Sequence, residues 1–87
     1  MAKLWRADEN TLVFECPGCG YGHPFDTTRW KWNGSIDKPT FHPSLLVWVM
    51  DPAKRCHSWV RDGKIQFLND CAHALAGQTV ELPEVEA

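Results

Sequence analysis

The stretch that decides the fold is Cys16-Pro17-Gly18-Cys19-Gly20. Two thiols stand two residues apart in a glycine-rich turn, so their sulfur atoms can converge on one ion. Zinc takes four such ligands in a tetrahedron, at about 2.3 Å from each sulfur. The other two cysteines, Cys56 and Cys71, lie far downstream. A metal site that recruits them would clamp the start of the chain to its last third, and we expect the rest of the fold to be built on that clamp.

Chain length and cysteine usage favour a metal site over disulfides. A chain of 87 residues forms one domain with a thin core, and such domains often need a staple. No signal peptide is visible at the N-terminus, which predicts the reducing cytoplasm, where thiolates bind metal rather than pair. We therefore expect a structural zinc ion, with two disulfides as the alternative. The predicted ligands are Cys16, Cys19, Cys56 and Cys71, and the substitutes are His23 and His73.

Charge and hydropathy weigh against two classes of partner. The net charge is −2 and there is no basic run, so nucleic-acid binding is the least favoured class. Such binding would require five dispersed cations to gather on one face: Lys31, Lys54, Arg55, Arg61 and Lys64. No apolar run approaches the ~18 residues of a membrane span, so no membrane partner is expected. The chain contains five tryptophans, and any exposed cluster of them would mark a surface for a protein partner.

The pattern of apolar residues and turns predicts a mostly β domain that spans residues 1–87. Short strands are expected at four places: Thr11–Glu15, Trp30–Trp32, Leu45–Met50 (as a buried strand) and Gln78–Leu82. One short helix is expected within Asn69–Gly77, capped by Asn69 or Asp70 and stopped by Gly77. Residues 84–87 read as a frayed tail. The predicted architecture is a small zinc-stapled β-sheet, similar to a zinc ribbon, with a central hairpin.

The central hairpin has the clearest local pattern. Two apolar-rich runs between Cys56 and Leu68 flank Asp62-Gly63, a strong two-residue turn signal. With this turn, Arg61 pairs with Lys64, and the pairing continues outward to Ser58 and Phe67. Because side chains alternate along a strand, Cys56 and its neighbour His57 point to opposite faces. His57 is therefore free of the face that carries the metal.

Ser44 and His57 are the candidate catalytic residues. Ser44 follows a proline at the entrance of the apolar strand, and serine becomes a nucleophile when a histidine takes its proton. Spacing alone does not show that the two side chains meet. The alternative roles are a hydroxyl at the start of a strand and a half-buried histidine, and the alternative pair is His42 and Ser58. Candidate acids that could orient the histidine are Glu15, Asp62 and Asp70.

An ordered series of motifs resembles a small zinc-knuckle protein family of phages and prophages, often mislabelled as ammonia monooxygenase. The motifs are residues 16–20 (CPGCG), 32–34 (WNG), 39–44 (PTFHPS), 56–68 (CHSWVRDGKIQFL), 70–77 (DCAHALAG) and 80–83 (VELP). This family is in turn similar to the serine-peptidase component of bacterial ubiquitin-like conjugation operons. The shared parts are the cysteine knuckle, the Pro-Ser pair and the hairpin. The block from Asp70 to Leu82 belongs to the phage group.

The resemblance implies a serine peptidase that trims the C-terminal tail of a ubiquitin-like protein. Its serine and histidine map onto Ser44 and His57. If the protein is encoded by a phage, it acts in the bacterial host cytoplasm. The alternative is a non-enzymatic zinc-binding module that binds a protein, such as a phage protein directed at host defence. A Ser44–His57 hydrogen bond would favour the peptidase, and an exposed tryptophan surface would favour the binding module.

Overall fold

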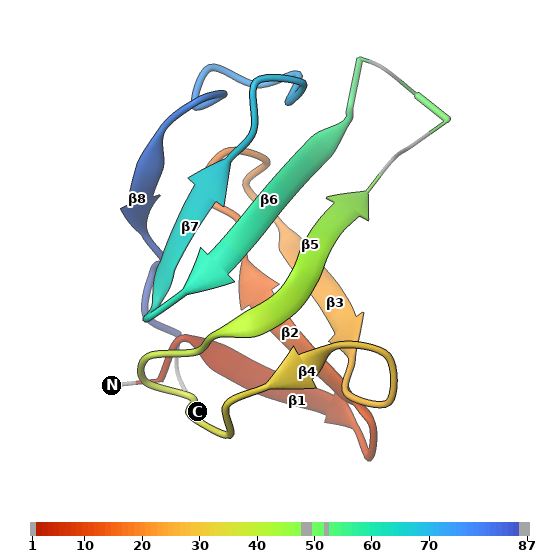
Figure 1. Cartoon of the computed structure of the whole chain (residues 1–87), viewed down its shortest axis with the longest axis vertical. Helices are drawn as coiled ribbons and strands as arrows, with labels where there is room; N and C mark the ends of the chain where they lie inside the picture. Colours follow the sequence, from red (N-terminus) through yellow and green to blue (C-terminus); the bar gives the residue numbers. More distant parts are fainter. Residues whose placement is uncertain (1, 48–49, 52, 86–87) are drawn as a thin grey trace.

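The computed structural model describes residues 2–47, 50–51 and 53–85, and these residues form two antiparallel β-sheets (Figure 1). The smaller sheet has the strand order β1-β2-β3, and the larger has the order β4-β5-β6-β7-β8. The strands are β1 (Leu4–Asp8), β2 (Thr11–Glu15), β3 (Gly22–Asp26), β4 (Lys31–Trp32), β5 (Phe41–Val47), β6 (Cys56–Arg61), β7 (Lys64–Phe67) and β8 (Thr79–Glu81). The prediction of a mostly β domain is confirmed. Within the described residues, no helical segment has the length and apolarity to cross a membrane.

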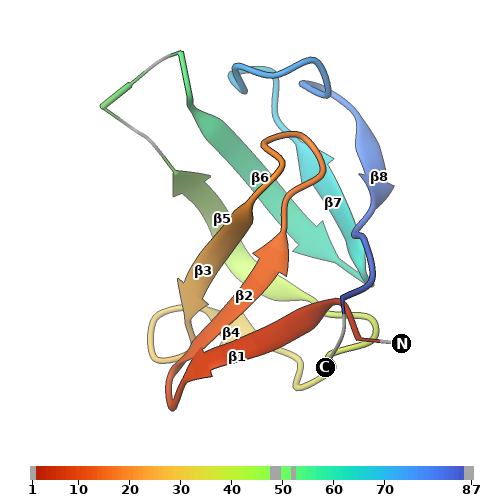
Figure 2. The same cartoon turned by 180° about the vertical axis from the view of Figure 1, so that it is seen from behind.

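The core lies between the two sheets, which cross one another in both views (Figures 1 and 2). Aromatic rings from both sheets meet there: Phe25 of β3 stacks on Phe41 of β5 at 3.9 Å between centroids, and Phe14 of β2 lies 5.8 Å from Phe41. Phe14 and Phe41 are almost completely buried. In so short a chain, large rings remove the most apolar surface from water per residue.

The central hairpin has the predicted register. Arg61 pairs with Lys64, and the ladder continues to Ser58 and Phe67. Both turn residues have positive φ, 50° at Asp62 and 77° at Gly63, which is the requirement of a tight two-residue turn whose twist matches the strands. Burial alternates along β6, with Cys56, Ser58 and Val60 buried and His57 and Trp59 half-buried. The predicted separation of Cys56 and His57 onto opposite faces is therefore confirmed.

The predicted short helix is absent: the described residues contain no helix, and Asn69–Gly77 forms successive turns. Its local backbone bonds are isolated and span three residues, namely Cys71 N–H to Leu68 O (3.2 Å) and Ala76 N–H to His73 O (3.2 Å). A helix this short has little stability of its own. Here the segment is instead held by contacts to the start of β6, because Ala72 N–H donates at 2.8 Å to the carbonyl oxygen of Arg55, the residue that precedes this strand.

The expected buried strand at Leu45–Met50 also needs correction. β5 begins earlier, at Phe41, and only one of its faces is buried in this part: Leu45 is buried and Leu46 is 40% exposed. Met50 is 92% exposed, and residues 48 and 49 lie outside the described residues. In the tail, Val85 N–H donates to Ala2 O at 2.8 Å, while residues 86–87 lie outside the description.

Candidate active site and metal cluster

Strands β5 and β6 bring Ser44 and His57 together on the outer face of the larger sheet. The register pairs Leu46 with His57, so Ser44 lies two residues along β5 from the position opposite His57 and points to the same face. Diagonal neighbours of this kind are within reach of a long side chain. Ser44 Oγ and His57 Nε2 are 2.9 Å apart, which is hydrogen-bonding distance.

A bulge in β5 precedes the serine. The ladder pairs Phe41 with Val60 and next pairs Leu45 with Ser58, so four steps along β5 oppose two steps along β6. The extra residues include Pro43, which has no N–H to place in a ladder. Bulges bend a strand and redirect the side chains beside them. The proline that precedes Ser44 in the sequence therefore sits where β5 departs from regular pairing.

The acid beside the histidine is Asp70. His57 Nδ1 lies 3.2 Å from Asp70 Oδ2. When Nδ1–H donates to this carboxylate, Nε2 carries a lone pair and can accept the Ser44 hydroxyl proton. Of the three acids that the sequence left open, the structure brings Asp70 to the site. The hairpin register could have indicated this, because Leu68 lies opposite His57 (Leu68 N–H to His57 O, 2.9 Å) and Asp70 follows two residues later.

Cys71 anchors the turn that carries this acid. The backbone N–H of His57 donates to Cys71 Sγ at 3.2 Å, and the Cys71 thiol donates to His57 O at 3.1 Å. Both bonds are to the backbone of the histidine whose ring contacts Asp70. The neighbouring residues Asp70 and Cys71 therefore hold His57 by its side chain and by its main chain.

The outer face around these side chains is accessible. The side chain of His57 is 25% exposed and that of Asp70 is 44% exposed. Leu46 lies beside them on the same face, and Trp59 packs there under Arg61, whose guanidinium is 4.9 Å from the ring centroid. A hydroxyl, an imidazole and a carboxylate in this order can perform acyl transfer on a chain that reaches the surface.

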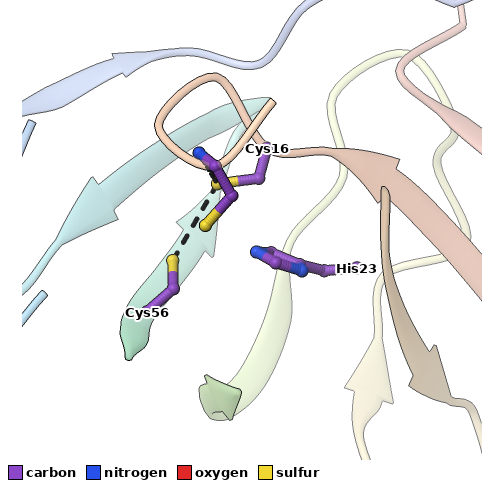
Figure 3. A group of neighbouring side chains, drawn as sticks. Cys16, His23 and Cys56 are labelled. Carbon is purple, nitrogen blue, oxygen red and sulfur yellow. Dashed lines mark hydrogen bonds between the residues drawn. The ribbon is translucent and has the colours of Figure 1, made fainter. Parts of the chain in front are cut away.

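A cluster of metal-ligating side chains joins the two sheets at one end. Cys16, Cys19, His23 and Cys56 place their ligand atoms within 4.8 Å of one another. Cys16 follows β2, His23 lies in β3, and Cys56 begins β6. Figure 3 shows the sulfur atoms of Cys16 and Cys56 facing each other, with the His23 ring beside them. This cluster could bind a metal ion.

Two observations test whether the cluster suits an ion. Cys16 Sγ and Cys56 Sγ are 3.9 Å apart, close to the separation of about 3.8 Å between two sulfurs in a tetrahedral zinc site. His23 is 2% exposed, and its Nε2 atom is buried without a hydrogen-bond partner among the described residues. Buried polar atoms normally have a partner, and a metal ion would supply it. The residues present therefore fit a metal site.

The cysteines of the cluster also shift one another's pKa values. The pKa of Cys16 falls to about 4, chiefly because the Cys56 thiol donates a hydrogen bond to the Cys16 thiolate. Burial, followed by repulsion from that thiolate, raises the pKa of Cys19 to about 11. The pKa of Cys56 is raised, first by its hydrogen bond to Cys16. The lowered pKa of Cys16 favours its thiolate, which is the form that binds metal.

The structure does not bring the four predicted cysteine ligands to one point. Cys71 belongs to a second group, with Cys56 and His73, and His23 takes the remaining place in the four-residue cluster. His73 Nε2 is 3.5 Å from Cys56 Sγ, and its ring covers Gly18 so closely that a Cβ there would lie 2.2 Å from it. Both histidines named as substitutes therefore lie close to the turn at residues 16–20: His23 beside Cys16 and Cys19, and His73 against Gly18.

Metal affinity distinguishes the observed cluster, which includes His23, from the predicted set of four cysteines, which includes Cys71. We expect His23→Ala to lower metal affinity by at least about tenfold, because it removes a ligand of the four-residue cluster. Cys71→Ser should leave affinity close to that of the wild type. Competition with a chromogenic chelator, followed by metal analysis of the protein, measures both. A large loss of metal affinity in Cys71→Ser, with wild-type affinity in His23→Ala, would show that the four cysteines are the ligands.

Comparison with protein-family models finds a match to the family described as bacterial ubiquitination-like system serine protease (BubE), over residues 2–68. No curated protein and no solved structure matches the chain. The matched residues include Ser44, His57 and the four-residue cysteine–histidine cluster, while Asp70 and Cys71 lie beyond them. A protease of a ubiquitination-like system has protein substrates. Because the match covers more than half of the chain, the protein belongs to the BubE family of bacterial ubiquitination-like system serine proteases.

Proposed function

We propose that the protein is a serine protease that cleaves the C-terminal tails of ubiquitin-like proteins. The observation that carries the proposal is the chain of two hydrogen bonds from Ser44 through His57 to Asp70, at 2.9 and 3.2 Å. It occurs in a member of a serine protease family, on an exposed face of the domain. Fold alone would not support a function, but this arrangement assigns a chemical role to each side chain.

The proposed reaction follows from the protonation states of these groups. His57 Nε2 takes the proton of Ser44 as the Ser44 oxygen attacks the scissile carbonyl carbon. The protonated histidine, stabilised by Asp70, then gives that proton to the leaving amine as the C–N bond breaks. Water attacks the resulting ester by the same route in reverse and releases the new carboxylate. Backbone N–H groups near Ser44 stabilise the negative oxygen of the tetrahedral intermediates.

The metal in this proposal is a structural zinc ion. Cys16, Cys19, His23 and Cys56 would hold it, and four protein ligands leave no open position for water. When bound, zinc supplies a cross-link between the two sheets. The catalytic side chains lie on the other face of β6 from Cys56, so the ion fixes the frame in which Ser44 and His57 meet.

The alternative of a tryptophan-lined binding module receives no support from the described tryptophans. Trp5, Trp30, Trp32 and Trp59 are all half-buried, and residue 48 lies outside the description. The exposed large apolar side chains among the described residues are Tyr21, Ile36, Leu46 and Met50. Of these, Leu46 belongs to β5, the strand that carries Ser44.

Processing of a tailed substrate tests the proposal. A ubiquitin-like protein from a bacterial ubiquitination-like system, extended at its C-terminus by a short reporter peptide, is incubated with the zinc-loaded enzyme. Intact-mass analysis should show two products whose masses sum to the substrate plus one water. Resistance of the fusion, or cleavage that a His57→Gln variant performs equally well, would contradict the proposed function.

The Asp70→Asn variant tests the role of Asp70 in orienting His57. We expect kcat to fall by about 10²–10⁴-fold, because the amide no longer fixes the histidine tautomer or stabilises its charged form. Asp70 is exposed, so the melting temperature should change little. Asp62→Asn, at an exposed acid in the hairpin turn, is the matched control and should retain wild-type kcat. Equal activity of the two variants would remove Asp70 from the mechanism.

A further inference from the structure

We infer that the open edge of β5 binds the substrate tail as an added β-strand. This inference rests on the proposed function, since it identifies how that site holds its substrate. The occupant is the extended C-terminal tail of a protein, recognised through its main chain. The edge carries the proposed nucleophile, so binding there places the tail directly beside Ser44.

One side of β5 is only partly covered. β4 pairs with β5 at two positions, Lys31 with His42 and Trp32 with Phe41. Beyond His42, the described part of β5 has no strand of its sheet on the side away from β6 (Figures 1 and 2). This open edge, which we define as Ser44–Val47, presents backbone groups that an incoming strand can pair with.

The hydrogen bonds of the sheet show which backbone groups face that side. Leu68 N–H donates to His57 O, so the backbone of His57 points toward β7. Because backbone direction alternates along a strand, Ser58 points toward β5, and its partner Leu45 points back toward β6. Leu46 on one side of Leu45, and Ser44 on the other, therefore direct their N–H and C=O groups to the open edge.

At the other end of β5, the backbone faces β4. Asn33 N–H donates to Thr40 O at 3.0 Å, which places the backbone of Thr40 on the β4 side. His42, two residues further along, pairs with Lys31 of β4. The β4 strand therefore covers this edge of β5 as far as His42, and the open edge begins beyond it.

Ser44 thus faces two ways: its side chain reaches His57 on the outer face, and its backbone faces the open edge. A peptide paired with Ser44 and Leu46 would run beside the backbone of β5 at strand spacing, about 4.8 Å, and so pass next to the Ser44 side chain. The exposed side chain of Leu46 would lie beneath its side chains. β4 occupies the edge as far as His42, so pairing extends from the serine in one direction only.

This geometry favours a flexible tail over a folded surface. Strand addition takes its affinity from main-chain hydrogen bonds, which any extended segment can offer. A strand inside a folded substrate already has its backbone groups paired. A C-terminal tail has free N–H and C=O groups, and it can enter an edge that β4 closes at one end.

The Leu46→Pro variant tests strand addition by changing the open edge of the enzyme. Leu46→Pro removes the edge-facing N–H, and we expect kcat/KM to fall about tenfold below that of Leu46→Ala, which loses the side chain but keeps the N–H. Thr79→Pro is the matched control on the opposite edge strand. Phe67 N–H donates to Gln78 O, so Gln78 faces β7 and Thr79 faces away from it. Equal kcat/KM in Leu46→Pro and Leu46→Ala would overturn the inference.

Backbone methylation of the substrate tests the edge without altering the protein. The probe is a synthetic peptide with the last eight residues of the ubiquitin-like protein followed by the same reporter extension, carrying one N-methyl group at each of the eight positions in turn. Methyl groups at alternate positions should lower kcat/KM about tenfold, with little effect between them. A flat profile for a peptide that is cleaved through Ser44 would refute strand addition and leave the proposed function standing.

Binding to an inactive variant separates the two claims completely. The unmethylated peptide is added to Ser44→Ala, and amide hydrogen exchange is followed residue by residue. Slower exchange at Leu46, with Leu45 unchanged because β6 already protects it, supports the edge whether or not the peptide is ever cleaved. Unchanged exchange at Leu46 under saturating peptide would overturn the inference.

Discussion

Replacing Ser44 by alanine is expected to lower kcat for tail cleavage by at least about 10³-fold, because the reaction loses the oxygen that forms the acyl-enzyme. The Ser44 hydroxyl lies 2.9 Å from His57 Nε2, within hydrogen-bonding distance of the base that would take its proton. Substrate binding should persist, since the tail is held by backbone groups. Single-turnover cleavage and peptide binding, measured on the same preparation, distinguish lost chemistry from lost affinity.

His42→Ala provides the matched control for this variant. His42 is exposed on the same strand two residues upstream and belongs to the alternative pair that the sequence suggested. The His42→Ala variant should cleave the tail at the wild-type rate and have an unchanged melting temperature. Ser58, the other member of that alternative pair, is 1% exposed on the inner face of β6, away from the side chains of Ser44 and His57. Loss of cleavage in His42→Ala, with Ser44→Ala active, would transfer the nucleophile's role away from Ser44.

Removal of the metal is expected to unfold the domain. The cluster ties the end of β2 and the strand β3 of one sheet to the start of β6 in the other. Structural zinc sites contribute about 10–16 kcal/mol of apparent binding free energy at neutral pH. Domains of this size have total stabilities of only about 5–15 kcal/mol. Adding a strong chelator should therefore abolish the β-sheet circular dichroism signal or lower the melting temperature by tens of degrees.

Recovery on adding back zinc is the control for chelation. Refolding with one equivalent of zinc should restore both the spectrum and tail cleavage, because the catalytic residues need no further component. The Cys16→Ser variant should behave as the chelated protein does even without chelator. An unchanged melting temperature after complete removal of metal would show that the core alone holds the sheets together.

The parts of the fold that the sequence predicted are those governed by local rules. The Asp62-Gly63 turn fixes the hairpin register, and the period of two then assigns each side chain to a face. The same alternation places Cys56 and His57 on opposite faces of β6, as observed. β2 was predicted with its observed bounds, because Thr11–Glu15 is a short apolar run that leads into the knuckle.

The parts that could not be predicted depend on long-range pairing. His23 reaches the cluster because β2 and β3 pair with Glu15 opposite Gly22, which returns the chain to the knuckle. Nothing in the spacing ranked this histidine above Cys71. The turns after β7 looked helical because they contain small residues and end at Gly77, yet their side chains serve as contacts to β6. The bulge that precedes Ser44 shows only in the register of two strands.

The most direct test of the central claim is the mass of the zinc-loaded protein after treatment with a fluorophosphonate, which reacts with serines activated by a neighbouring base. We predict one adduct per chain, located on Ser44 by peptide mapping, with labelling strongly reduced in His57→Gln and in Asp70→Asn. An unlabelled protein, an adduct on another residue, or full labelling of His57→Gln would contradict a serine protease built from Ser44, His57 and Asp70.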